Sequence, residues 1–93
     1  MDLIEELTRD SERILEREIE EVHQLMDSVW TLLSDIAQHQ REKSHSEEEL
    51  QQIETRMEKH LVQIEEAKRQ KIEQARERHR ERIKALLEWA RKR

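Results

Sequence analysis

The second half of this chain repeats its apolar residues every eleven positions. One track contains Leu50, Leu61, Ile72 and Ile83, and a second contains Ile53, Ile64, Ala75 and Leu86. A third track, which is half polar, contains Met57, Lys68, His79 and Ala90. Eleven residues in three turns correspond to about 3.67 residues per turn, close to the relaxed α-helix. The repeat therefore predicts a long helix that packs nearly straight, or with a slight right-handed coil, against its neighbours.

The composition favours helices throughout the chain. Of the 93 residues, 44% are charged and none is Gly, Pro or Cys, which is typical of coiled coils and long helices. Strands are not expected, because hairpins between strands depend on Gly, Asn or Pro turns. Only 33% of the residues are hydrophobic, which is low for a self-contained core at this length. We therefore expect a partner chain to supply part of the burial.

No apolar run in the sequence exceeds three residues. This predicts a soluble chain without a membrane span or a secretory signal peptide, and leaves its localisation undetermined.

Residues 38–49 contain no apolar side chain, so this segment is the expected break between helices. Ser44 and Ser46 can cap a helix, and Ser46 followed by Glu49 fits the capping box. We predict one unit of residues 1–93, with helix 1 at about 2–42, a loop at about 43–46 and helix 2 at about 46–92. The fold class is then all-α: an antiparallel hairpin of two long helices that associates into a straight or weakly supercoiled bundle.

The alternative is one continuous helix with a polar middle, and the charge distribution favours the hairpin. Residues 1–22 contain 3 basic and 9 acidic side chains, a net charge of −6, whereas residues 67–93 contain 11 basic and 4 acidic ones, a net charge of +7. A turn at 43–46 places these segments side by side, with residue i near residue 89 − i. Exposed pairs are individually weak, so this complementarity is expected to set orientation more than stability.

Two polar interruptions of the apolar faces fit the same register. Glu18 is expected near Lys68, and Ser11 near His79. Buried polar groups are costly unless they are paired, so these positions are interpreted as pairs that fix the register. The alternative is that all four side chains extend into solvent.

The apolar face of helix 1 is wider than a two-helix contact requires, because adjacent apolar residues broaden it. One hairpin would leave part of this face uncovered, so we expect self-association, with a dimer favoured by the frequency of closed symmetry and a trimer by the unequal faces. The predicted core and interface residues are Leu7, Leu15, Ile19, Val22, Leu25, Met26, Val29, Leu33, Ile36, Leu50, Ile53, Met57, Leu61, Ile64, Ile72, Ile83 and Leu86.

Residue patterns that could carry chemistry are weak. Glu20 with His23, and Glu42 with His45, form the Glu-x-x-His spacing of dicarboxylate metal bundles, but the first pair follows core positions and the second lies at the predicted loop. No metal, cofactor or catalytic site is therefore expected. The basic residues of 76–84 alternate with Glu77 and Glu81, which predicts a solvated face rather than a surface for nucleic acid or membrane.

In style the chain resembles computationally designed helical bundles. The resemblance rests on long helices without breakers, an acidic start, a basic end and serine caps at a short loop. It implies a structural module that self-assembles into a homo-oligomeric bundle and has no catalytic activity. Two alternatives stay open: a natural coiled-coil fragment of an adaptor or tether that binds a helical partner, and a bundle that binds a metal or a porphyrin.

Overall fold

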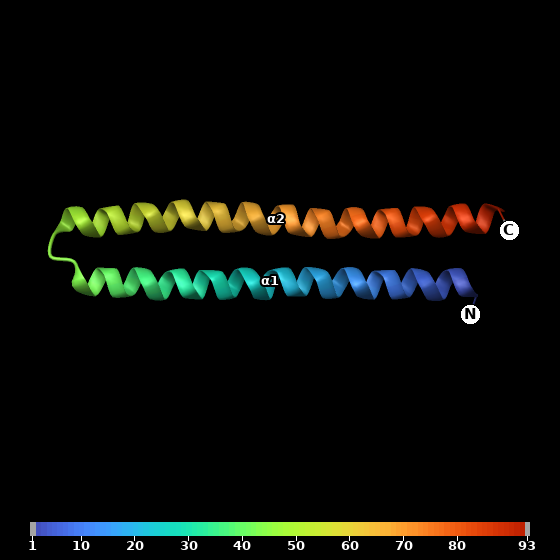
Figure 1. Ribbon diagram of the computed structural model, residues 1–93, viewed down its shortest axis with the longest axis horizontal. Coiled ribbons are helices and arrows are strands. Elements are labelled where there is room, and N and C mark those ends of the chain that lie inside the picture. The colour runs from blue at the N-terminus through green and yellow to red at the C-terminus, as the bar shows by residue number, and fades with distance from the viewer. Residues whose placement is uncertain (1, 93) are drawn as a thin grey trace. The chain divides into compact units, whose positions relative to one another are not determined.

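The computed structural model describes residues 2–92; Met1 and Arg93, which the predicted unit includes, lie outside the described residues. Helix α1 covers Leu3–Lys43 and helix α2 covers Glu47–Lys92, as Figure 1 shows. The predicted all-α helical hairpin is confirmed. The alternative of one continuous helix is wrong, because α1 ends at Lys43 and α2 begins at Glu47.

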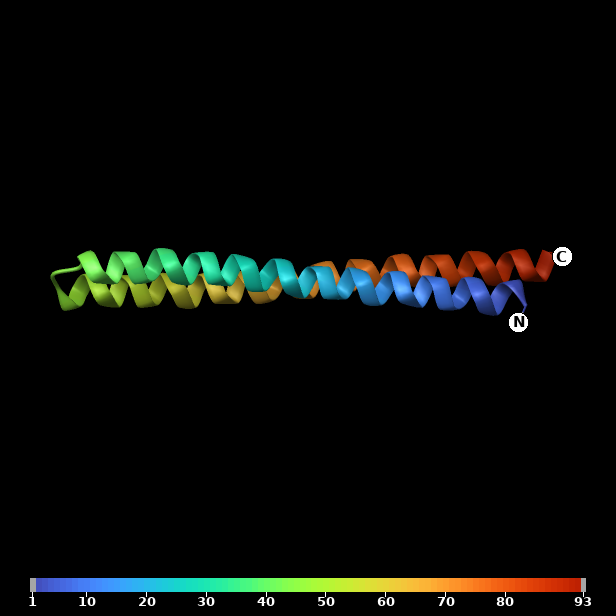
Figure 2. The same ribbon diagram turned by 90° about the horizontal axis from the view of Figure 1, so that it is seen from below.

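The chain divides into two compact units, each made from both helices. The loop unit is His23–Arg69, which contains the end of α1, the connection and the start of α2. The terminal unit consists, within the described chain, of residues 2–22 and 70–92. In each unit a segment of α1 lies antiparallel to a segment of α2 (Figures 1 and 2).

Asp2 caps the start of α1. Its Oδ1 atom accepts a hydrogen bond from the backbone N–H of Glu5 at 2.9 Å, and its carbonyl oxygen accepts one from the N–H of Glu6 at 3.2 Å. Acidic side chains follow in the first turn at Glu5 and Glu6, where the helix dipole favours negative charge. The helix therefore starts at a residue whose side chain satisfies a free backbone amide.

Ser46 caps the start of α2, but the reciprocal half of the predicted capping box is displaced by one residue. The N–H of Glu49 donates to Ser46 Oγ at 3.1 Å. Glu49 Oε2 in turn accepts from the N–H of His45 at 3.3 Å and from Ser44 Oγ at 3.1 Å. The Glu49 carboxylate therefore holds the connection itself, rather than the N–H of the capping serine.

The loop unit has an apolar interior. Its buried side chains are Met26, Ala37, Ile53 and Ile64, exposed by 8, 2, 4 and 9%. At the surface of this unit, Arg41 Nη2 of α1 forms an ion pair with Glu54 Oε1 of α2 at 2.7 Å. Apolar burial supplies the main attraction between the two helix segments here.

The terminal unit is buried at small side chains. Ala75 is 0% exposed and Ser11 is 4% exposed. Ala75 continues the spacing of Ile53 and Ile64 along α2, so three successive positions of one eleven-residue track are buried. The small side chains of Ser11 and Ala75 allow the two backbones of the terminal unit to approach closely.

Candidate association surface

An exposed apolar track runs along α1 in both units. Its members are spaced eleven residues apart: Leu3, Ile14, Leu25 and Ile36, exposed by 47, 45, 51 and 47%. We call this set the outer track. Leu7 and Leu32, exposed by 36 and 61%, also lie on α1 among the exposed large apolar side chains.

Each outer residue is followed directly by a more buried one. These inner residues are Ile4, Leu15, Met26 and Ala37, of which the first two are half-buried and the last two are buried. Successive residues of an α-helix point about 100° apart, so one member of each pair faces α2 and the other lies on the flank. The wide face of helix 1 is therefore two separate tracks.

The predicted core and interface residues fall into three groups. Met26, Ile53 and Ile64 are buried. The half-buried group is Leu15, Ile19, Val22, Val29, Leu33, Met57, Ile72, Ile83 and Leu86. The exposed group is Leu7, Leu25, Ile36, Leu50 and Leu61. The exposed residues are not part of the core of a single chain.

Four apolar residues that matter for these faces are absent from the predicted core and interface residues. Leu3 and Ile14 belong to the outer track, whereas Ala37 and Ala75 belong to the interior. The signal for the outer track was present, because its four members repeat every eleven residues as the tracks of α2 do. The two alanines are missed by any ranking that places the larger apolar side chain inside.

In the terminal unit, an open groove of about 390 Å³ runs beside the outer track. Its walls come from both helices, and its lining residues are Leu7, Asp10, Ser11, Ile14, Arg82, Ala85 and Leu86. Apolar side chains make up most of this lining, with one acidic residue on α1 and one basic residue on α2. The groove therefore joins apolar surface to charges of opposite sign.

A polar cluster lies at the groove and joins the two helices. Ser11 Oγ is 2.9 Å from His79 Nδ1 and accepts a hydrogen bond from Arg82 Nε at 2.7 Å. Ser11 can donate its single proton to His79 while it accepts from Arg82, which satisfies both partners at once. The predicted proximity of Ser11 and His79 is thus present in the structure.

Glu18 has partners other than the predicted Lys68. Its carboxylate accepts hydrogen bonds from Arg78, through Nε at 3.2 Å and through Nη2, and lies 4.0 Å from Arg82 Nη1. Side chains of a helix point toward the N-terminus of that helix. In an antiparallel pair, a side chain of α1 therefore points toward higher residue numbers on α2. It meets α2 residues that come later in the sequence than the residue directly opposite, and it points away from those that come before. Lys68 leans toward the loop, and the long side chain of Arg78 leans toward Glu18.

Arg82 has one unsatisfied hydrogen-bonding group. Within residues 2–92, its Nη2 atom is buried and has no hydrogen-bond partner, although Nε and Nη1 contact Ser11 and Glu18. A buried donor without an acceptor costs about 1–3 kcal/mol. The polar cluster therefore stabilises the terminal unit less than a fully hydrogen-bonded arginine would.

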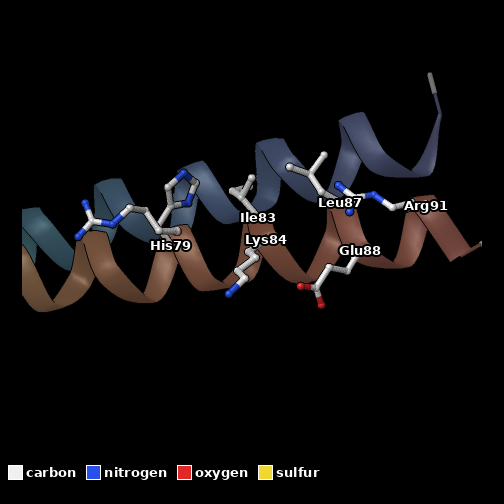
Figure 3. A pocket seen from close by; sticks show the side chains of 7 residues that line it. His79, Ile83, Lys84, Leu87, Glu88 and Arg91 are labelled. Carbon is white, nitrogen blue, oxygen red and sulfur yellow. The ribbon is translucent and has the colours of Figure 1, made fainter.

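A second groove, of about 550 Å³, lies along the end of α2. Figure 3 shows that its labelled side chains all arise from α2, with Lys84 and Glu88 pointing away from the ribbon of α1. Its walls include Ile83 and Leu87, but polar and charged side chains such as Arg91 make up the rest. A third groove, of about 560 Å³, has a largely polar lining from 35–42 of α1. Neither combines apolar walls from both helices.

Metal-ligating side chains do not gather in the part of the chain that the structure describes. Over residues 2–92, no three His, Asp or Glu side chains come close enough together to hold a metal ion. The two Glu-x-x-His pairs, at residues 20–23 and 42–45, therefore lack a third ligand within these residues.

No family model, curated protein or solved structure matches this chain. Within residues 2–92, neither helix has a stretch that is both long and apolar enough to cross a membrane.

Proposed function

We propose that this chain is a structural self-assembly module, which forms a homo-oligomeric helical bundle by covering the outer track of α1 with a second copy. The observation that carries the proposal is the exposure of Leu3, Ile14, Leu25 and Ile36 by 45–51% at constant eleven-residue spacing. Scattered exposed apolar residues are normal on monomers, but an ordered series on one helix is typical of a packing face.

The eleven-residue spacing also supports a helical partner. A straight helix with about 3.67 residues per turn presents one such track as a continuous line, which a second helix with the same repeat can follow. The chain carries this repeat on both of its helices, so another copy offers a matching face. A dimer is the favoured assembly, since two-fold symmetry is the commonest closed arrangement. The proposal assigns no catalytic role.

Sedimentation equilibrium tests the proposal directly. The wild-type chain is expected at twice the 11.5 kDa mass of one copy. The double substitution Ile14→Glu with Leu25→Glu places two charges in the proposed contact, and should weaken association by at least about 100-fold, equivalent to about 2.7 kcal/mol. Circular dichroism then shows whether the separated chain keeps its helices.

Val62→Glu is the matched control. Val62 is 69% exposed on α2 and lies off the outer track, so the same chemical change there should leave the mass unchanged. A wild-type chain that sediments at 11.5 kDa would contradict self-assembly. Partial unfolding of that monomer would then point to the alternative of a coiled coil whose helical partner is a different protein.

A further inference from the structure

The groove of the terminal unit has walls of opposite charge. Its α1 wall belongs to residues 2–22, which contain 3 basic and 9 acidic side chains, a net charge of −6. Its α2 wall belongs to residues 70–92, which contain 8 basic and 4 acidic side chains, a net charge of +4. A helix of a second copy that lies along this groove contacts an acidic wall and a basic wall. The charge of that helix therefore affects which of its possible positions is favoured.

Two symmetric arrangements can cover the outer track with a second copy. A two-fold axis parallel to the helices places α1 of one chain over α2 of the other, with the terminal units together. A two-fold axis perpendicular to the helices places α1 over α1, with each terminal unit over a loop unit. Both arrangements are closed and isologous, so apolar burial alone does not choose between them.

We propose that the copies associate with their terminal units together, so that the acidic start of α1 in one chain covers the basic end of α2 in the other. This inference rests on the proposed self-assembly and specifies its geometry. In the perpendicular arrangement, residues 2–22 would instead face residues 23–43, which contain 2 basic and 3 acidic side chains. That contact joins two acidic segments, whereas the α2 segments of the same arrangement oppose +4 in 70–92 with −3 in 47–69, from 4 basic and 7 acidic side chains. Its charges are therefore less complementary than the −6 against +4 of the proposed arrangement.

Cysteine cross-linking distinguishes the two arrangements, because the chain contains no cysteine of its own. Leu7→Cys and Ala85→Cys are made as separate variants and mixed. These residues line opposite walls of one groove, so the proposed axis brings Leu7 of one copy to Ala85 of the other. Ile14→Cys mixed with Leu32→Cys reports the perpendicular arrangement, in which residues 2–22 of one copy run antiparallel to residues 23–43 of the other.

The expected result is a disulfide-linked mixed dimer from Leu7→Cys with Ala85→Cys, and little from either variant alone or from the second mixture. Its dissociation constant, measured before oxidation, should rise by about tenfold from about 0.1 M to about 1 M salt, because screening shortens the reach of the opposite charges. Cross-linking of Ile14→Cys with Leu32→Cys instead would overturn the arrangement but leave self-assembly standing. A monomeric wild-type chain would remove both.

Discussion

The two units use the same pair of helices in different ways. The buried side chains of the loop unit are apolar, with Met26 and Ile64 among them, whereas those of the terminal unit are Ser11 and Ala75. The charges of the two units differ too. In the loop unit, residues 23–43 of α1 contain 2 basic and 3 acidic side chains, a net charge of −1. Residues 47–69 of α2 contain 4 basic and 7 acidic side chains, a net charge of −3. The terminal unit opposes −6 with +4.

The two units therefore hold the helices together by different interactions, apolar burial in one and hydrogen bonds at a fixed register in the other. Apolar burial is strong but tolerates sliding, since one apolar layer resembles the next. Hydrogen-bonded groups such as Ser11, His79 and Arg82 are satisfied at one register only. The loop unit therefore encloses the larger of the buried side chains. The terminal unit contributes the alignment of its two helix segments and, in our proposal, of the copies.

The largest change in the free energy of unfolding is expected from Ile64→Ala, which tests the apolar interior of the loop unit. Ile64 is 9% exposed in the loop unit, and loss of its side chain removes buried apolar area and leaves a cavity. The free energy of unfolding should fall by about 2–4 kcal/mol. Urea unfolding measures it at one fixed protein concentration, because association would otherwise shift the apparent stability.

Val62→Ala is the control for that change, two residues away on the same helix. Val62 is 69% exposed, so its truncation should alter the free energy of unfolding by no more than about 0.5 kcal/mol. Equal losses for the two variants would show that Ile64 is not part of a packed interior.

A smaller effect is expected from Ser11→Ala in the terminal unit. The substitution removes the acceptor of Arg82 Nε and the partner of His79 Nδ1, so two part-buried groups lose a hydrogen bond. The free energy of unfolding should fall by about 1–2 kcal/mol, again from urea unfolding. Ser28→Ala is the comparison, since Ser28 is exposed and bonds only to Gln24 O of its own helix at 2.9 Å. If both serines behave alike, the cluster does not stabilise the terminal unit.

Much of the fold could be predicted because its signals are local. The absence of apolar residues in 38–49 and the capping ability of Ser46 lead to a break at the observed place, with α1 at Leu3–Lys43 against an expected 2–42 and α2 at Glu47–Lys92 against 46–92. The buried track of α2 follows directly from the eleven-residue repeat. These features depend on the spacing of apolar residues and on capping residues, both of which can be read from the sequence.

The division of the α1 face into an outer and an inner track was harder to predict, because neighbouring apolar residues are equivalent in a sequence. Ile36 and Ala37 compete for the same interior, and hydrophobicity favours isoleucine, yet Ile36 is 47% exposed and Ala37 is 2% exposed. The helices approach closely enough that the small side chain is enclosed and the large one is displaced to the flank. The partner of Glu18 was missed for a similar reason, since it depends on the lean and reach of side chains rather than on level alone.

The smallest change in the free energy of unfolding is expected from the exposed ion pairs, which should contribute equally little in both units. Arg80 of the terminal unit lies 3.0 Å from Glu73 and also pairs with Glu77, and Arg69 of the loop unit lies 2.6 Å from Glu66. All are solvent-exposed contacts within α2, and such contacts contribute little to stability. They provide a baseline against which the effects at Ile64 and Ser11 can be judged.

The hydrogen bond from Arg80 lowers the pKa of Glu73, with a further lowering by the positive charges of Arg80 and Arg76 and an opposing effect of desolvation. A lowered pKa in the folded state means that the ionised carboxylate is favoured, so its contribution is present above the pKa of the unfolded chain and is lost as the pH falls through the lowered value. Arg80→Gln should therefore raise the pKa of Glu73 toward its ordinary value, while urea unfolding at neutral pH stays nearly unchanged. An NMR titration of the Glu73 carboxyl carbon measures the midpoint in both chains. An unchanged midpoint would mean that Arg80 does not hold Glu73 in solution, and a large loss of stability would mean that surface pairs, rather than Ser11 and its partners, align the terminal unit.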